Sequence, residues 1–194
     1  MLPVVSRLLI ALSLAAAACG NPDNLIVGGA SPTETTPLVL FDNINSSIAG
    51  TVQLTDPGGA SLGTSTVVIL SDRPDLCSVL AAHPDYFRKP PEGYLAEILF
   101  LPPGRLGTFW VGRVGDEGTS SEIIAINQGG DTVTPFTVTN GGYIALTEWN
   151  DNAGANASGS FDLVYFDPQR IALHEFQGRF RATVCSALQK VLLP

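Results

Sequence analysis

The chain has 194 residues, a length that suits one domain together with a short targeting segment. It carries 18 acidic and 10 basic residues, which gives a formal net charge of −8 at pH 7. A chain with this charge is repelled by nucleic-acid phosphates and by anionic lipid surfaces. Nucleic-acid binding is therefore excluded as a function.

Residues 1–18 have the pattern of an export signal. One basic residue, Arg7, precedes an apolar run from Leu8 to Ala18, and a polar stretch begins after Cys19. A helix needs about 20 apolar residues to cross a bilayer, so this run is too short to be a spanning anchor. Its length and its small terminal residues indicate a cleaved secretory signal and not a buried helix.

Ala16-Ala17-Ala18-Cys19 resembles the lipobox of bacterial lipoproteins, in which small residues precede a cysteine that becomes the acylated first residue. Leucine usually stands where this chain has Ala16. The resemblance implies that Cys19 carries fatty acids such as palmitate and that the protein is anchored to a membrane without spanning it. Gly20 follows the cysteine, with no acidic residue there to retain the protein at the inner membrane, so we expect the outer membrane. The alternative is plain signal cleavage, which leaves Cys19 as a free thiol.

The cysteine count predicts one disulfide. Removal of residues 1–18 leaves all three cysteines in the chain. It also takes away Arg7, so the net charge changes from −8 to −9. Three cysteines in an oxidising compartment leave one unpaired. Lipidation of Cys19 accounts for the odd one and leaves Cys77 to pair with Cys185. The alternative is two buried free thiols.

The rest of the chain divides into a tether and a domain. Residues 19–37 are rich in Gly, Pro, Ser, Thr and Asn and are predicted to be a flexible tether with an end-to-end distance of roughly 20–25 Å. In residues 38–194, short apolar segments alternate with Gly, Pro, Asn and Asp breaks, which predicts a single β domain.

The predicted strands, in chain order, are residues 38–44, 48–54, 64–70, 95–101, 108–114, 122–126, 133–139, 143–149, 160–166 and 171–184. Two of them contain continuous apolar runs, Val67–Leu70 and Ile98–Leu101, as expected for strands covered on both faces. One short helix is predicted between Pro74, which suits a first turn, and Pro84, which ends it.

In the last strand, alternate residues predict one dry and one wet face. The dry face holds Phe176, Gly178, Phe180, Ala182 and Val184, and the wet face holds Gln177, Arg179, Arg181 and Thr183. Together these elements predict an antiparallel β-sandwich with one short helix. The alternative is a closed β-barrel, because an up-and-down meander can close.

Four segments, SDRPDLCSVL, GGYIALTEWN, GSFDLVYF and QGRFRATVC, resemble a group of uncharacterised bacterial lipoproteins. In that group a Gly-Ser-Phe-Asp-Leu strand precedes a Gly-x-Phe-x-Ala strand that ends in cysteine. The resemblance covers roughly residues 64–188 and implies a lipid-anchored β domain with a disulfide. It implies no activity. The repeated Gly-x-apolar-x-apolar pattern at Gly50, Gly159 and Gly178 is interpreted as strand architecture.

Gly59-Ala60-Ser61-Leu62-Gly63 matches G-x-S-x-G, the nucleophile elbow of α/β-hydrolases. That elbow needs a strand before the serine and a helix after it. Here a turn is predicted before Ser61 and a strand after it. We therefore interpret the segment as a hairpin loop and expect no catalytic residue there.

Neither histidine has a partner at metal-ligand spacing. His83 is expected near the end of the helix, and His174 is expected in solvent. The oxygen-rich loop from Glu148 to Asn156 lacks the EF-hand spacing and is interpreted as a turn, with calcium as the alternative. No metal and no cofactor are predicted. Four acidic residues are taken as ordinary surface acids: Asp72, Asp75, Glu92 and Glu97.

The aromatic residues Phe109, Trp110, Tyr143 and Trp149 are expected to fill the core or cap its end, with a ligand cavity as the alternative. The leading functional prediction is a non-enzymatic envelope lipoprotein with an interaction or structural role. Its partners would be the membrane, through the lipid anchor, and an envelope protein. A carrier of a small apolar ligand is the second hypothesis, and an esterase-like hydrolase that uses Ser61 is the third.

Overall fold

The computed structural model of the chain describes residues 26–30, 44–55, 59–88, 95–112, 119–126, 132–167, 172–191 and 193. The predicted strand 38–44 lies outside this part, except for Ile44. The described strands are β1 (Ile26–Ala30), β2 (Ser46–Thr55), β3 (Ser61–Ser71), β4 (Leu95–Leu101), β5 (Gly107–Trp110), β6 (Ser120–Ile126), β7 (Thr132–Glu148), β8 (Asn156–Asp167) and β9 (Ala172–Val184). The helices are α1 (Leu76–Ala82) and two 3-10 turns, η1 (Tyr86–Arg88) and η2 (Ser186–Lys190).

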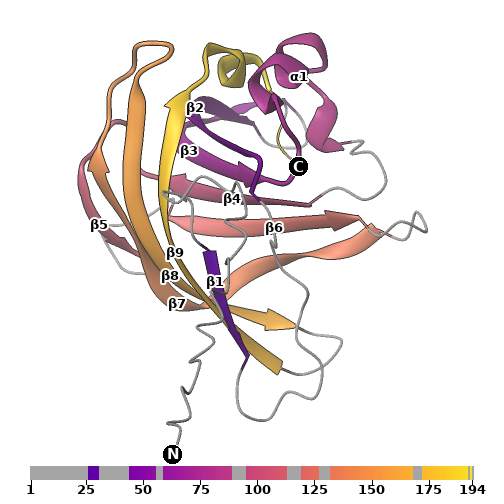
Figure 1. Cartoon of the computed structure of the whole chain (residues 1–194), viewed down its shortest axis with the longest axis vertical. Helices are drawn as coiled ribbons and strands as arrows, with labels where there is room; N and C mark the ends of the chain where they lie inside the picture. The colour runs from indigo at the N-terminus through magenta and orange to yellow at the C-terminus, as the bar shows by residue number, and fades with distance from the viewer. Residues whose placement is uncertain are drawn as a thin grey trace, which may run out of the picture.

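The strands form one curled sheet in the order β1-β9-β2-β3-β4-β6-β7-β5, and β8 pairs with both β7 and β9 (Figure 1). Neighbouring strands are antiparallel except β2 and β9, which run parallel. This parallel contact comprises two residue pairs, Ile48–Thr183 and Ala49–Val184. The predicted all-β class with one short helix is confirmed. The sheet is mixed, however, and this brief contact does not make the regular closed barrel of the alternative prediction.

The two strands predicted over residues 133–139 and 143–149 are one long strand, β7. The break in the sequence pattern comes from Gly141 and Gly142, which adopt positive φ angles of 108° and 114°. The pairing of β7 with β8 shifts its register between Val138 and Gly142. Glycine allows the chain to bend here without leaving the sheet, because it lacks the Cβ that makes positive φ costly.

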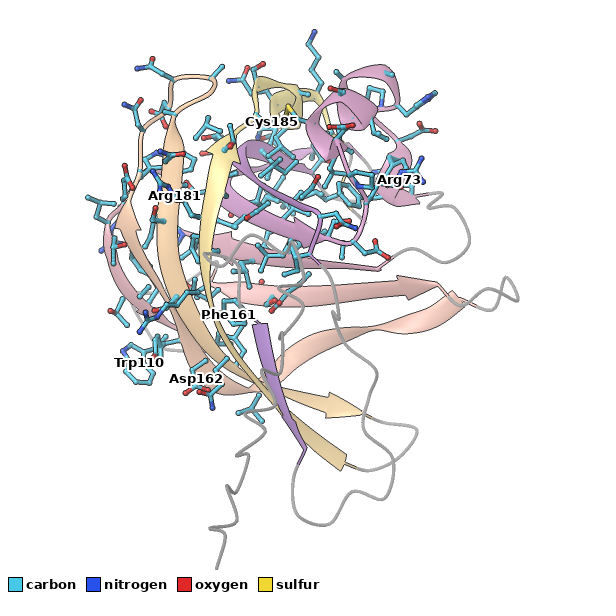
Figure 2. The ribbon with its side chains drawn as sticks, viewed as in Figure 1. Arg73, Trp110, Phe161, Asp162, Arg181 and Cys185 are labelled. Carbon is cyan, nitrogen blue, oxygen red and sulfur yellow. A yellow bond between two sulfur atoms is a disulfide. The ribbon has the colours of Figure 1, made fainter. Side chains whose placement is uncertain are left out.

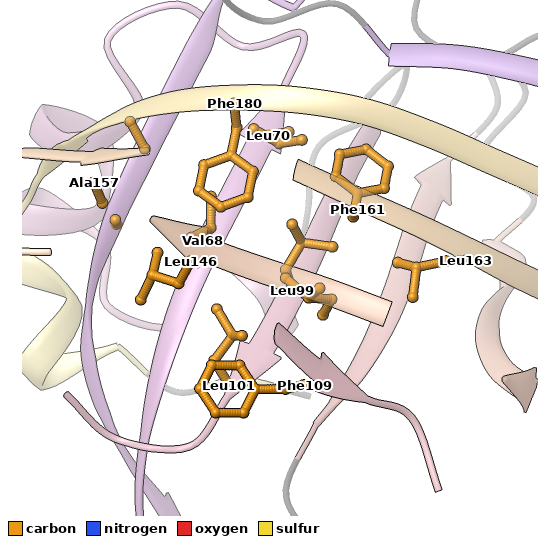
Figure 3. Packing of buried hydrophobic residues seen from close by; sticks show 13 residues of the cluster. Val68, Leu70, Leu99, Leu101, Phe109, Leu146, Ala157, Phe161, Leu163 and Phe180 are labelled. Atoms are coloured by element: carbon orange, nitrogen blue, oxygen red, sulfur yellow. The ribbon is translucent and has the colours of Figure 1, made fainter. Parts of the chain in front are cut away.

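Apolar side chains from both walls of the curled sheet point toward one another and form an inner cluster (Figure 3). Its largest fully buried members include Phe161, Leu99 and Ile144. Phe180 and Ala182 belong to it, whereas Gln177, Arg179 and Arg181 are exposed. The predicted dry and wet faces of the last strand are confirmed for these five residues.

A second, outer cluster covers the opposite face of β2, β3 and β4. Val67, Ile69 and Ile98 pack there against residues of α1, η1 and η2. Val68 and Leu99 instead face the inner cluster. The prediction that the continuous apolar runs are covered on both faces is therefore confirmed.

Cys77 in α1 and Cys185 after β9 form the predicted disulfide, with their Cα atoms 5.8 Å apart. The bridge ties the only α-helix of the described part to the end of the last strand. α1 begins at Leu76, whose backbone N–H donates to Ser46 Oγ at 3.2 Å. It ends before His83, one residue ahead of Pro84. This helix was predicted between the two prolines, and that placement is confirmed.

Part of the range predicted to be a flexible tether forms a strand. β1 pairs antiparallel with β9 from Ile26 opposite Gly178 to Ala30 opposite His174. The stretch begins with Ile26 and Val27, which favour extended backbone because their side chains branch at Cβ. The overall polar composition of residues 19–37 favoured a tether, although this short stretch has a β-forming tendency. The stretch forms a strand because it pairs with the edge of β9.

Candidate functional site

Ser61 does not lie on a nucleophile elbow. It is the first residue of β3 and is exposed, and the elements on both sides of it, β2 and β3, are strands of one hairpin. Its Oγ accepts a hydrogen bond from Gln53 Nε2. Within the described residues no hydrogen bond joins Ser61 to a histidine. The hairpin interpretation of the G-x-S-x-G segment fits these contacts.

The two histidines lie in different parts of the fold. His83 is exposed, and its backbone N–H donates to the carbonyl of Val79 at the end of α1. The backbone of His174 lies in β9, between Ala30 of β1 and Tyr165 of β8. The side chain of His174 lies outside the described part of the structure.

Oxygen atoms of the segment from Glu148 to Asn156 accept hydrogen bonds from groups of the protein, one in a turn of the loop after β7 and one between paired residues of β7 and β8. Asn150 Oδ1 accepts the backbone N–H of Asn152 at 2.9 Å, which is an Asx turn. Glu148 Oε2 accepts the hydroxyl of Ser158 at 2.9 Å. In the described part of the chain, no group of three or more His, Cys, Asp or Glu residues could hold a metal ion.

The prediction for the four acidic residues is wrong for Glu97. Asp75 is exposed and Asp72 is half-buried, but Glu97 has no exposed surface, and Glu92 lies outside the described residues. Glu97 belongs to the same face of β4 as Leu99, so the alternation of the strand turns its side chain inward. The alternation of residues 97, 99 and 101 is the signal in the sequence that places Glu97 on this face.

Glu97 contributes a polar group to the otherwise apolar inner face. The hydroxyl of Ser121, which has no exposed surface, donates to Glu97 Oε1 at 3.4 Å. Ser121 lies opposite Leu99 in the pairing of β4 with β6. A carboxyl group is costly to bury unless it is hydrogen-bonded, so this contact lowers the cost of the arrangement.

The aromatic residues divide between the core and the surface. Phe109 is buried in the inner cluster and Trp149 packs against it, as predicted for core-filling aromatics. Trp110 is 43% exposed, and its ring centroid lies 5.4 Å from that of Tyr143 on the neighbouring strand. Trp110 lies on the outside of the sheet (Figure 2), and Tyr143 separates it from Asp162 of β8 in the strand pairing. A shared ligand cavity for all four aromatics is therefore excluded.

An open groove of about 350 Å³ lies where β2 and β9 separate. Its floor and walls come from the start of β2, the first turn of α1 and the end of β9. The lining residues are Ile44, Asn45, Ser46, Ser47, Ile48, Asp75, Leu76, Cys77, Ser78, Arg181 and Thr183. We call this feature the junction groove.

The junction groove is lined mainly by polar groups. Arg181 contributes a positive charge on the exposed face of β9 (Figure 2), whereas Asp75 contributes a negative charge at the start of α1. Ser46 Oγ is engaged by the backbone of α1. Ser47 Oγ is buried and has no hydrogen-bond partner among the described residues. These groups suit a polar, extended occupant better than a compact apolar ligand.

Burial raises the pKa of the Tyr86 phenol above its ordinary value of 10.0, and the positive charge of Arg73 partly offsets this effect. Tyr86 packs in the outer cluster beneath α1. A raised pKa keeps the phenol protonated at neutral pH, which makes it a poor general base.

Cys19, the predicted lipidation site, lies outside the described residues. Among the helices that the structure describes, none is both long enough and apolar enough to cross a membrane. Comparison with known proteins finds no matching family model, no matching curated protein and no matching solved structure.

Proposed function

We propose that this protein is a non-enzymatic lipoprotein of the bacterial envelope, held at the outer membrane by fatty acids on Cys19. The observation that carries the proposal is the Cys77–Cys185 disulfide. A disulfide of this kind is typical of proteins exported from the cytosol. It also leaves Cys19 as the single remaining cysteine, directly after a run of small residues at the end of an apolar segment.

The anchor would be durable without a spanning helix. Each buried methylene of an acyl chain contributes about 0.8 kcal/mol, and two or more chains hold a protein stably on a bilayer. The folded domain would then act beside the membrane as an interaction or structural module. The polar junction groove is the surface that we favour for such contacts.

The contacts of the described residues give less support to the other hypotheses. Ser61 Oγ accepts a hydrogen bond from Gln53 Nε2 on an exposed hairpin. This contact does not activate the serine hydroxyl as a nucleophile. The inner face of the sheet is occupied by thirteen buried residues in mutual contact, a poor setting for a carrier of apolar ligands. We therefore rank the carrier second and the hydrolase third.

Mass spectrometry of the full-length chain, expressed in a Gram-negative host and isolated from its envelope, tests the proposal. We expect an N-terminal peptide that begins at Cys19 and carries fatty acids, and we expect the protein in the outer-membrane fraction. The Cys19→Ala variant should lose both the fatty acids and the membrane association. The matched Cys77→Ala variant should keep both.

Two results would contradict the proposal. One is a wild-type protein that retains residues 1–18, and the other is a protein that begins at Cys19 with an unmodified thiol. Inner-membrane fractionation of an acylated protein would contradict only the assigned location.

A further inference from the structure

Two aromatic rings and a carboxylate lie in one line across three neighbouring strands. Trp110 of β5 is opposite Tyr143 of β7, and Tyr143 is opposite Asp162 of β8. Directly opposite residues of antiparallel strands have their Cβ atoms about 4.5–5.5 Å apart. We call these three residues the aromatic–acid row.

The aromatic–acid row is on the outer face of the curled sheet. Residues next to its members in the three strands belong to the inner cluster: Phe109, Ile144 and Phe161. Successive side chains of a strand point to opposite faces, so the members of the row point outward. Figure 2 labels two of them, Trp110 and Asp162.

The aromatic part of the row is open to solvent. Trp110 is 43% exposed and Tyr143 is half-buried. Their ring planes are inclined by 56°, so the rings do not cover each other as a parallel stack would. The π faces of Trp and Tyr attract cations, and Trp does so most strongly.

The acid of the row has no counter-ion. Asp162 is half-buried, and no hydrogen bond or ion pair joins its carboxylate to another group of the described residues. Arg179 lies opposite Ser160 on the same face, but it forms no ion pair with Asp162. A carboxylate beside two π faces gives this surface the electrostatic character of a cation site.

We propose that the aromatic–acid row binds an arginine side chain of a basic partner protein. The proposal rests on the proposed function, because it assigns a partner chemistry to a domain that acts as an interaction module. The row is a second contact surface, since none of its residues lines the junction groove.

Arginine fits the row better than lysine does. Its guanidinium group is planar and weakly hydrated, so it stacks on an aromatic ring at a low cost of desolvation. The same group pairs with a carboxylate through two parallel hydrogen bonds. The ammonium group of lysine is strongly hydrated and approaches a carboxylate as a point charge. Rings and a carboxylate on adjacent strands therefore match the two binding modes of one guanidinium group.

The charge of the whole chain favours a basic partner. The formal net charge is −8 at pH 7. A surface of this sign attracts a basic protein over a distance and repels an acidic one. Trp, Tyr and Arg are also the residue types that contribute most to the binding energy of protein interfaces.

Nuclear magnetic resonance of the protein isolated from the envelope in a non-ionic detergent tests the site. The chain has two tryptophans, and Trp149 packs against the inner cluster, so the two indole N–H signals separate the row from the core. The probe is one arginine between two glycines, with both ends of the peptide blocked. We expect it to shift the Trp110 signal in a saturable manner and to leave that of Trp149 unchanged. The matching lysine peptide should bind about twofold more weakly or worse.

Variants of the row identify the groups that bind the probe. We expect Asp162→Asn to weaken binding by about threefold to tenfold, because a charge-assisted pair is lost. Tyr143→Ala should weaken it by about twofold to fivefold, the range of a cation–π contact at an exposed site. Asp151→Asn is the matched control, since it removes the same charge from an exposed residue of the loop after β7 and should leave binding unchanged. Circular dichroism verifies the fold of each variant, and added salt should weaken binding to the wild type.

Several results would overturn the proposal. These are a Trp110 signal that does not shift, equal binding of the arginine and lysine peptides, and wild-type affinity in Asp162→Asn. Tighter binding of tetramethylammonium than of the arginine peptide would overturn the assignment to arginine. Fatty acid on Cys19, measured in the same samples, separates the two proposals. Fatty acid without arginine binding rejects only this site, and arginine binding without fatty acid rejects only the anchor.

Discussion

Gly159 shows how a single position in β8 is restricted by the strands around it. A Cβ atom at Gly159 would lie 2.0 Å from the backbone oxygen of Ala145 and 2.5 Å from Cζ of Phe180. Phe180 is the residue opposite Gly159 in β9, so the ring occupies the space that a side chain would need. Gly50 is similar, since a Cβ there would meet the Leu188 side chain at 2.8 Å. These close approaches support the interpretation of the glycine pattern as architecture.

We expect Gly159→Ala to lower the free energy of unfolding by about 1–3 kcal/mol or more, because neither a backbone oxygen nor a buried ring can move away cheaply. Urea denaturation followed by circular dichroism measures the change. The neighbouring variant Ser160→Ala is the control and should stay within about 0.5 kcal/mol of the wild type. Equal stability of the two variants would show that the strands can separate at this point.

At the scale of elements, α1 depends on tertiary contacts. It has only seven residues, and isolated helices of this length are not stable in water. Leu76 and Leu80 are buried in the outer cluster, and Cys77 is bonded to Cys185. The apolar stripe and the bridge therefore hold the helix against η2 and the strands beneath it.

Removal of this bridge should destabilise the whole domain. The bridged residues are 108 apart in the sequence, and the chain-entropy model gives such a loop about 4–5 kcal/mol. We expect the double variant Cys77→Ala with Cys185→Ala to lose about 2–5 kcal/mol of unfolding free energy in urea. The wild type in reducing agent should show a comparable loss. An unchanged midpoint in both would mean that the two clusters hold the helix without the bridge.

At the scale of the molecule, β2, β3 and β4 form a wall shared by the inner and outer clusters. Neighbouring residues of one strand serve different clusters, as Ile98 in the outer and Leu99 in the inner cluster show. Both side chains are fully buried. If either cluster loses its packing, the backbone of β2, β3 and β4, which also supports the other cluster, is disturbed. We therefore expect the domain to unfold as one unit.

Ile98→Ala and Leu99→Ala provide a matched pair to test this coupling. Each should cost about 2–5 kcal/mol, the usual range for truncation of a buried aliphatic residue. Tryptophan fluorescence reports on the inner cluster through Trp149, and far-ultraviolet circular dichroism reports on all strands. In both variants the two signals should change at the same urea concentration. Separate transitions in either variant would contradict a single cooperative unit.

Local pattern was sufficient for most strands and for α1, and the cysteine count, with Cys19 assigned to the lipid anchor, predicted the pairing of Cys77 with Cys185. The alternation in β9 and the continuous runs in β3 and β4 reflect which faces are dry, and this information is local. The same alternation indicates that Glu97 is buried, in conflict with the general rule that charged residues lie at the surface. The absence of an elbow at Ser61 also followed from its neighbours in the chain.

The sequence by itself determined the strand positions, the covered faces and the cysteine arithmetic, because each depends on residues close in the chain or on simple counting. Only the tertiary structure decided which strands are neighbours, and with them the parallel contact between β2 and β9, the docking of β1 and the junction groove. Ile48 and Thr183 are far apart in the sequence, and nothing in the periodicity of either segment specifies the other. Their pairing follows from the curl of the whole sheet, which brings its last strand back beside β2.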